Sequence, residues 1–269
     1  MTTKEIIREN FKNIHQLIEY IKNNPRNPVF ANERFLASSE VDSYRTNFTK
    51  TKTFDEALHL LQYGWHEKAK ELENRLKAKK INATNKSQKS IYDVVGHQAS
   101  VPRYLQGIPT NMVNKKTIIK KQPVITIVKN IGYNSNVDSE TIMEQSVKAL
   151  QIIQTIENSG TRVNLDLIKY TSGIKQNMVT RIRIKNAGER LNISKMAFPL
   201  IHPSMLRRIM FAHVETCREL RDNSYSGGYG RSMNTHEELK SVVKNNEYVI
   251  PGFIENVDDT IKEMGLKTK

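Results

Sequence analysis

The chain contains 269 residues, of which 38% are hydrophobic and 26% are charged, a composition typical of a soluble globular protein with some polar segments. No apolar run approaches the roughly 20 residues that span a bilayer, and the single cysteine excludes an internal disulfide or a cysteine-based zinc site. The formal net charge of +14 favours a polyanionic partner, because lysine and arginine displace counterions from phosphates. The N-terminus has no signal-peptide core, so we expect a cytoplasmic protein.

Residues 1–80 are predicted to form a helical N-terminal region. Thr2 and Glu5 have the spacing of a capping box, and apolar residues at intervals of three and four follow as far as Ile21. A residue ahead of proline is pushed out of helical geometry. We therefore expect a first helix that begins near Thr2 and ends before Pro25.

Two further helices are predicted in the same region. A second capping box at Thr53 opens a helix through Leu61, and after Gly64 another helical run extends to about Lys80. A helix, a glycine turn and a helix are the outline of a DNA-binding helix-turn-helix, and equally the outline of an ordinary helical hairpin.

Positive charge is concentrated in the next part of the chain, where residues 68–121 hold 13 Lys or Arg against three acidic residues. Residues 81–122 are predicted to form a basic linker followed by an ordered excursion. The run 77–90 is polar and low in apolar residues, whereas 96–112 combines prolines and glycines with apolar anchors. The basic residues of this stretch either face solvent or contact phosphates.

Residues 123–269 are predicted to form an α/β domain. The apolar run Val124–Val128 is typical of a strand buried on both faces of a parallel sheet. A helix at 139–159 and strands at 162–170 and 178–185 follow it. We therefore expect a doubly wound, mostly parallel, Rossmann-like sheet, completed by helices and a short last strand, with the N-terminal region as a helical extension.

The strand 178–185 alternates sharply, with isoleucines on one face and Arg181, Arg183 and Lys185 on the other. A charged row of this kind protects an edge strand against unwanted pairing, and it also suits contact with phosphates. We therefore expect an edge strand that presents basic side chains at the surface.

The helix 203–220 carries the side chains that come nearest to an active site. His202 and Glu215 can exchange protons, and the arginines of this helix can hold an anion, but the sequence places no second catalytic group opposite them. The glycine-rich loop 225–232 lacks the spacing of a phosphate-binding loop, and the sequence has no nucleophile elbow. These observations favour a protein that is not an enzyme.

The order of strand, long helix, strand, antiparallel strand, helices, strand and helix from Val124 to Met264 resembles the von Willebrand factor A domain. That family has a doubly wound α/β sheet and a metal site after its first strand, built from Asp-x-Ser-x-Ser. These positions fall at Asn130, Gly132 and Asn134 of this sequence, so the carboxylate is missing and one hydroxyl is replaced by hydrogen. Because divalent cations of this type need charged oxygen donors, we expect no metal here, and no cofactor.

Two segments, 101–109 and 202–208, are similar to uncharacterised proteins encoded by bacteriophages and mobile elements, which implies a bacterial host cell as the setting. The leading hypothesis is a non-enzymatic nucleic-acid-binding accessory protein that contacts phosphates through basic segments. The alternative is a protein-interaction or virion-assembly module with a metal-free von Willebrand A-like domain, which has a protein partner or forms a homo-oligomer. Neither hypothesis involves a membrane.

The residues predicted to contact nucleic acid are the basic side chains of these segments and two residues of the glycine-rich loop, whose tyrosine suits stacking on unpaired bases. They are Lys77, Lys79, Lys80, Lys86, Lys89, Arg103, Lys115, Lys116, Arg181, Arg183, Lys185, Arg207, Arg208, Tyr229 and Arg231.

Overall fold

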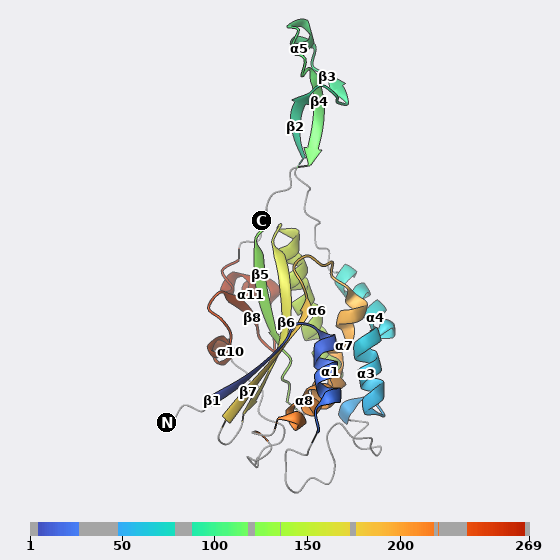
Figure 1. Ribbon diagram of the computed structural model, residues 1–269, viewed down its shortest axis with the longest axis vertical. Coiled ribbons are helices and arrows are strands. Elements are labelled where there is room, and N and C mark those ends of the chain that lie inside the picture. The colour runs from blue at the N-terminus through green and yellow to red at the C-terminus, as the bar shows by residue number, and fades with distance from the viewer. Residues whose placement is uncertain are drawn as a thin grey trace. The chain divides into compact units, whose positions relative to one another are not determined.

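The computed structural model describes residues 5–26, 48–78, 88–117, 122–134, 136–172, 176–217, 220 and 236–266. The chain divides into two compact units, one formed by Met1–Ile81 together with Val124–Lys269 and the other by Asn82–Pro123. Figure 1 labels most of the elements of both units. The N-terminal region and the α/β region therefore share one unit.

The larger unit is built on a mixed five-stranded sheet with the strand order β1-β7-β6-β5-β8. β1 is parallel to β7, and β5 is parallel to both β6 and β8, whereas β6 and β7 are antiparallel. The mostly parallel α/β sheet expected from the sequence is thus present. Its strands are β1 (Glu5–Phe11), β5 (Val124–Asn130), β6 (Arg162–Ser172), β7 (Gln176–Lys185) and β8 (Glu247–Ile250).

β5 lies inside the sheet and is buried on both faces. Ile127 packs into the large hydrophobic core, and its neighbour Val128, which points to the opposite face, packs into a second, smaller cluster with Ile168 and Val249. The continuous apolar run in the sequence reflects this position, because both faces of the strand are covered by other elements.

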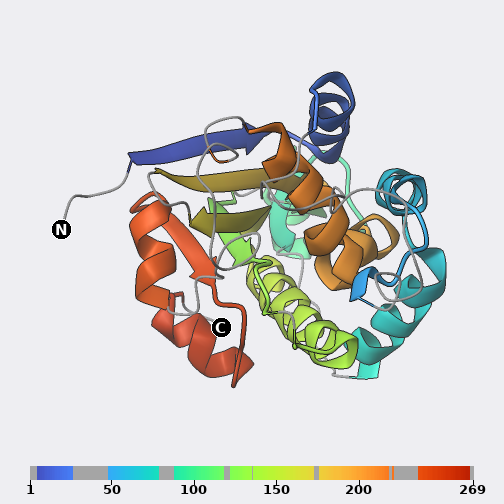
Figure 2. The same cartoon turned by 90° about the horizontal axis from the view of Figure 1, so that it is seen from below.

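Helices cover both faces of the sheet (Figure 2). α6 (Ser139–Asn158) begins at Asp138, whose side chain accepts a hydrogen bond from the Thr141 N–H, so the predicted cap is confirmed. The large core also contains α7 (Ile193–Ile201), the π-helix η1 (Met205–Met210) and α8 (Phe211–Thr216). α10 (His236–Val242) covers the second face, and α11 (Val257–Glu263) packs against α6.

The N-terminal segment corrects one prediction. Residues predicted to begin a helix at Thr2 instead form β1, and helix α1 (Ile14–Asn23) begins only after Asn13, whose side chain accepts from the Gln16 N–H. Ile7 and Phe11 of β1 pack toward the helices. Pairing with β7 therefore decides the conformation of a segment whose local sequence also suits a helix.

The predicted helical hairpin is present and packs against the rest of the unit. Thr53 caps α3 (Phe54–Tyr63) by accepting from the Glu56 N–H, and α4 (His66–Ala78) follows Gly64. Gly64 has φ +93°, and a Cβ there would lie 2.8 Å from the Ser194 carbonyl oxygen. The two helices pack against α7, and their buried residues, including Leu58 and Leu72, belong to the large core, which supports the ordinary hairpin.

The smaller unit is a three-stranded antiparallel sheet with the strand order β2-β4-β3. It contains β2 (Gln88–Asp93), β3 (Gln98–Ala99), the short helix α5 (Val101–Leu105) and β4 (Met112–Thr117). The proline- and glycine-containing segment 96–112 thus contains β3, α5 and the first residue of β4. Across the described ranges, the structure contains no helix with the length and apolar character needed to traverse a bilayer.

Candidate interaction surface

The smaller unit depends on a close crossing of two chain segments. β2 and β3 lie on opposite sides of β4, so residues 94–97 cross over that strand. Gly96 lies at the crossing, where a Cβ would be 2.3 Å from the Val113 carbonyl oxygen. Since no side chain fits there, glycine is required for the crossover.

Arg103 holds α5 on this small sheet. Its Nε donates to the Thr110 carbonyl oxygen at 2.9 Å, its Nη2 donates to Thr110 Oγ1 at 3.1 Å, and its guanidinium lies 4.3 Å from the centre of the Tyr92 ring. Cation–π stacking and the planar fork of donors make arginine well suited to this position. The residue predicted to contact phosphate thus has a structural role inside the unit.

The opposite side of α5 is apolar and faces outward. Val101, Tyr104 and Leu105, at positions i, i+3 and i+4, are 63%, 68% and 78% exposed. An ordinary surface helix buries such a stripe and exposes its charged residues, whereas α5 does the reverse. Val94 and Val95 of the crossover are also exposed. We call these five residues the apolar surface of the smaller unit.

This concentration of exposed apolar groups is unusual within the described part of the chain. Six of its nine exposed large hydrophobic residues lie between Tyr92 and Leu105, and none of residues 90–115 is buried. Isolated exposed apolar residues are normal, but a cluster of them marks an interaction site. The smaller unit therefore presents a surface with the composition of an interface.

The same unit is strongly basic, with seven Lys or Arg against one acidic residue, Asp93, in residues 82–123. Lys115 is exposed on β4. Lys89 lies opposite Lys116 in the register of β2 and β4. Lys86 lies outside the described residues.

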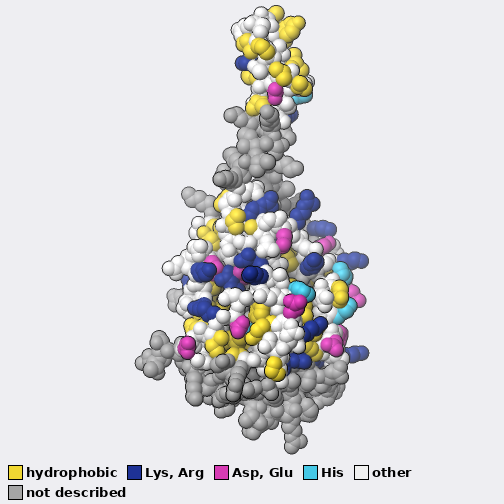
Figure 3. All heavy atoms as spheres, in the orientation of Figure 1, with side chains coloured by type: hydrophobic (Ala, Val, Ile, Leu, Met, Phe, Trp, Pro, Cys, Tyr) yellow, Lys and Arg dark blue, Asp and Glu magenta, His cyan; other side chains and the backbone are white. Residues whose placement is uncertain are grey.

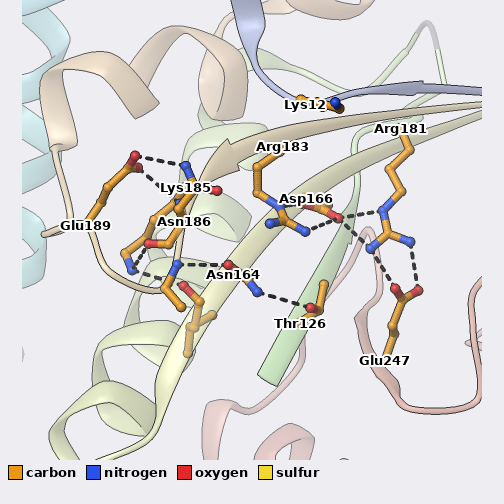
Figure 4. Close-up of polar contacts among 12 residues, drawn as sticks. Lys12, Thr126, Asn164, Asp166, Arg181, Arg183, Lys185, Asn186, Glu189 and Glu247 are labelled. Atoms are coloured by element: carbon orange, nitrogen blue, oxygen red, sulfur yellow. Dashed lines mark hydrogen bonds and ion pairs between the residues drawn. The ribbon is translucent and has the colours of Figure 1, made fainter. Parts of the chain in front are cut away.

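The strand register corrects the prediction that 178–185 is an edge strand, because β7 lies between β1 and β6. Arg181 and Arg183 of β7 are held by the carboxylates of Asp166 on the adjacent strand β6 and of Glu247 on β8 (Figure 4). Arg181 donates to both carboxylate oxygens of Glu247 at 2.8 Å, and both arginines donate to the buried carboxylate of Asp166. Burial acts to lower the pKa of Arg181, but its bonds to Glu247 and Asp166 outweigh this effect and raise that pKa.

Two guanidinium groups therefore face two carboxylates, so this network carries no net charge toward a phosphate. In the space-filling view of the larger unit, Lys and Arg side chains are likewise interspersed with acidic ones (Figure 3).

Lys185 lies on the opposite face from Arg183. A register irregularity next to Leu165 makes Ile184 an extra residue in β7, which breaks the alternation of side chains. The buried Lys185 ammonium donates to Glu157 Oε1 at 2.6 Å and to the Val163 carbonyl oxygen at 3.0 Å. The prediction that Lys185 shares an outward row with the two arginines is therefore wrong.

Arg207 and Arg208 bind the backbone of residues 48–52. Arg208, which is fully buried, donates to the carbonyl oxygens of Thr51 and Lys52 at 2.9 and 3.0 Å. Arg207 donates to the Phe48 carbonyl oxygen at 2.7 Å, and burial lowers its pKa. The π-helix η1 thus carries two consecutive arginines that hold the same segment.

His202 and Glu215, which were considered for proton transfer, lie in different surroundings in the described structure. His202 is buried between the rings of Trp65 and Phe198, its Nδ1 accepts from the Ser204 N–H at 3.0 Å, and burial lowers its pKa to about 4. Glu215 lies elsewhere, where its charge acts on Lys169. Arg218, an arginine of the helix predicted at 203–220 and considered for anion binding, lies outside the described residues.

Two buried lysines were missed by sequence reasoning. Burial lowers the pKa of Lys129 and of Lys169 to about 7 in each case. Lys169 donates to Thr171 Oγ1 at 2.8 Å, near His213, whose pKa is lowered to about 3 by burial and by the Lys169 charge. The period-two pattern Leu165, Leu167, Lys169 places this lysine on the inward face, so extending that pattern would have found it.

At the carboxyl end of β5, the described residues 130–134 carry amide, apolar and tyrosine side chains. Asn130 is buried and its Oδ1 accepts from the Gly132 N–H at 2.9 Å. A small pocket beside Tyr133 is lined mainly by apolar residues, with His202 and Arg207 at its polar side. Throughout the ranges that the structure describes, no three His, Cys, Asp or Glu residues are grouped as metal ligands.

The remaining predicted contacts are only partly placed. Lys77 is exposed at the end of α4. Lys79, Lys80, Tyr229 and Arg231 lie outside the described residues.

The fold defines a mixed α/β protein with a mostly parallel sheet and a separate small β unit. The chain belongs to the family described as domain of unknown function DUF7192, whose family model matches residues 1–267. No curated protein and no solved structure matches the chain.

Proposed function

We propose that this protein is a non-enzymatic interaction protein whose smaller unit docks onto a protein partner. The observation that carries this proposal is the orientation of α5, which turns Arg103 toward the sheet and Val101, Tyr104 and Leu105 outward. Fully burying an aliphatic side chain of this size contributes about 1.5–3 kcal/mol. A partner that covers the apolar surface therefore gains considerable free energy.

The partner has an apolar pocket rimmed by acidic side chains. The apolar part of this pocket matches the exposed aliphatic residues of the smaller unit. Its acidic rim matches the positive charge of residues 82–123, which contain seven basic residues and one acidic residue. We place this activity in a phage or mobile-element accessory protein within the cytoplasm of the host bacterial cell. The larger unit serves as a metal-free, von Willebrand A-like scaffold.

A photo-crosslinking amino acid at Leu105 of the full chain, expressed in the host cell, would identify the partner. The purified partner is then titrated against the chain and against the Val101→Ser/Leu105→Ser variant. We expect the variant to bind on the order of a hundredfold more weakly, because two aliphatic side chains no longer contribute about 1.5 kcal/mol each.

Val124→Ser is the matched control, because Val124 is an exposed valine of the larger unit. Equal binding by the double variant and the unchanged chain, or an absence of specific crosslinks from Leu105, would refute the proposal.

Nucleic-acid binding through the same unit is a second candidate. It is favoured by the basic excess of residues 82–123 and by the exposed rings of Tyr92 and Tyr104, which suit stacking on bases. It ranks second because nucleic-acid interfaces are polar, whereas four of the six exposed residues here are aliphatic. A filter-binding titration against DNA and RNA tests it, since phosphate contact requires binding that weakens steeply with salt.

A further inference from the structure

The sheet of the smaller unit is incomplete on one side of β4. β2 pairs with all six residues of β4, from Met112 to Thr117. On the other side, β3 pairs only with Met112 and Val113. Among the residues that the structure describes, none pairs with β4 beyond Val113 on that side, and we call residues 114–117 the open edge of the strand.

The direction of the backbone groups along this edge follows from two hydrogen bonds. The carbonyl oxygens of Asn111 and Val113 accept from Ser100 and His97, on the side of β3. Backbone groups alternate in direction along a strand of an antiparallel sheet. The N–H and C=O groups of Lys115 and Thr117 therefore point to the open edge, and those of Asn114 and Lys116 point to β2.

We infer that this open edge accepts an extended acidic segment of the partner protein as an added strand. Strand addition supplies the main-chain hydrogen bonds that the edge lacks, and alternate side chains of the added strand set its specificity. Charge decides the kind of segment, because two of the four edge residues are lysines and the unit has seven basic residues against one acidic residue.

Charge also argues against a second copy of this chain in that position. Lysines at an edge disfavour pairing with a like-charged strand, and two copies joined at residues 114–117 bring lysines against lysines. This inference rests on the proposed function. It adds a second contact to the partner, distinct from the apolar surface of the smaller unit.

The test uses the full chain and a synthetic peptide, Glu-Val-Glu-Val-Glu-Val-Glu, with a peptide of the same length in which lysine replaces glutamate. Binding is followed by fluorescence anisotropy of a labelled peptide, and the site by hydrogen exchange of backbone amides. We expect saturable binding of the acidic peptide, no binding of the basic peptide, and slower exchange at Lys115 and Thr117.

Proline at position 115 provides a backbone test, because it removes an N–H that faces the open edge and not β2. We expect Lys115→Pro to bind the acidic peptide about fivefold more weakly or worse, as expected for the loss of a backbone hydrogen bond. Lys115→Gln, which keeps the N–H, separates the contribution of charge. Retained protection of the Asn114 and Lys116 amides shows that the β2–β4 pairing is intact in the proline variant. If proline disrupts this pairing, the test of the inference is peptide binding by Lys115→Gln together with the exchange pattern of the unchanged chain.

Failure of the acidic peptide to bind, or protection confined to α5, would overturn the inference. Concentration-dependent dimerisation that Lys115→Pro abolishes would also overturn it, because a second copy would then occupy the edge. The Val101→Ser/Leu105→Ser variant separates the two proposals. This variant should retain peptide binding, because its substitutions lie outside the open edge. Loss of partner binding with normal peptide binding identifies the apolar surface as an independent contact, whereas normal binding of both would leave only the edge correctly assigned.

Discussion

Replacing Lys129 by methionine should change how the stability of the larger unit depends on pH. The Lys129 ammonium is buried and donates to the carbonyl oxygens of Pro251 and Gly252 at 2.8 and 3.2 Å and to the Tyr133 hydroxyl at 3.3 Å. Methionine keeps most of the side-chain volume but cannot titrate. The variant therefore isolates the effect of burying an ionisable amine.

The sign follows from the two pKa values of Lys129, which are about 7 in the folded chain and 10.5 for the ordinary lysine. Between these values the unfolded chain binds a proton that the folded chain does not, so the free energy of unfolding rises with pH. The slope is about 1.4 kcal/mol per pH unit for one group. Lys169 adds a similar slope, so the unchanged protein should gain about 2.7 kcal/mol per unit and the variant about half of that.

Urea unfolding measured at several pH values between 7.5 and 9.5 checks this prediction. Trp65 is the only tryptophan and lies in the larger unit, so its fluorescence reports that unit alone. Lys77→Met, which removes an exposed lysine, is the control and should leave the slope unchanged. Parallel pH curves for the unchanged protein and Lys129→Met would refute the argument from burial.

Two further changes test the architecture. Asp166→Asn should lower the free energy of unfolding by about 2 kcal/mol in the Trp65 assay, because Arg183 loses its carboxylate partner in a largely buried site. The control Asp259→Asn breaks the exposed pair with Lys262 and should lower the free energy of unfolding by less than about 0.5 kcal/mol. Equal effects of the two substitutions would contradict this argument. Gly96→Ala should abolish amide protection in β3 and β4, since the added Cβ would meet the Val113 carbonyl oxygen. The Trp65 unfolding transition should not change. Gly188→Ala, where the added Cβ meets open space, is the control. Undisturbed protection in Gly96→Ala would show that the crossover tolerates a side chain.

Local sequence signals predicted several element boundaries correctly. Thr53 and Asp138 cap helices as expected, because an N-cap depends on a side chain and an N–H three residues later in the same segment. The buried strand β5 was likewise readable from its apolar run, since burial on both faces removes the alternation seen in half-exposed strands. These features are determined within a few neighbouring residues.

Features that depend on residues distant in the sequence could not be predicted from local sequence signals. The segment Glu5–Phe11 has a local helix signal but pairs with β7, about 170 residues away in sequence, as in the register Glu5 opposite Gln176. The outward direction of Lys185 was predicted from strict alternation, which a bulge at Ile184 interrupts. A bulge arises from pairing with another strand, so the sequence of one strand does not reveal it.

The candidate site shows the same division. The sequence by itself determined the mostly parallel α/β class and the basic charge of residues 68–121, because composition and apolar patterning express them directly. Only the tertiary structure decided which charges are available. It pairs Arg181 and Arg183 with Asp166, turns Arg207 and Arg208 inward, and directs Arg103 toward Tyr92 while α5 exposes its apolar stripe. The physical reason is that charge and hydrophobicity belong to each residue, whereas exposure depends on the neighbours that the fold brings to it.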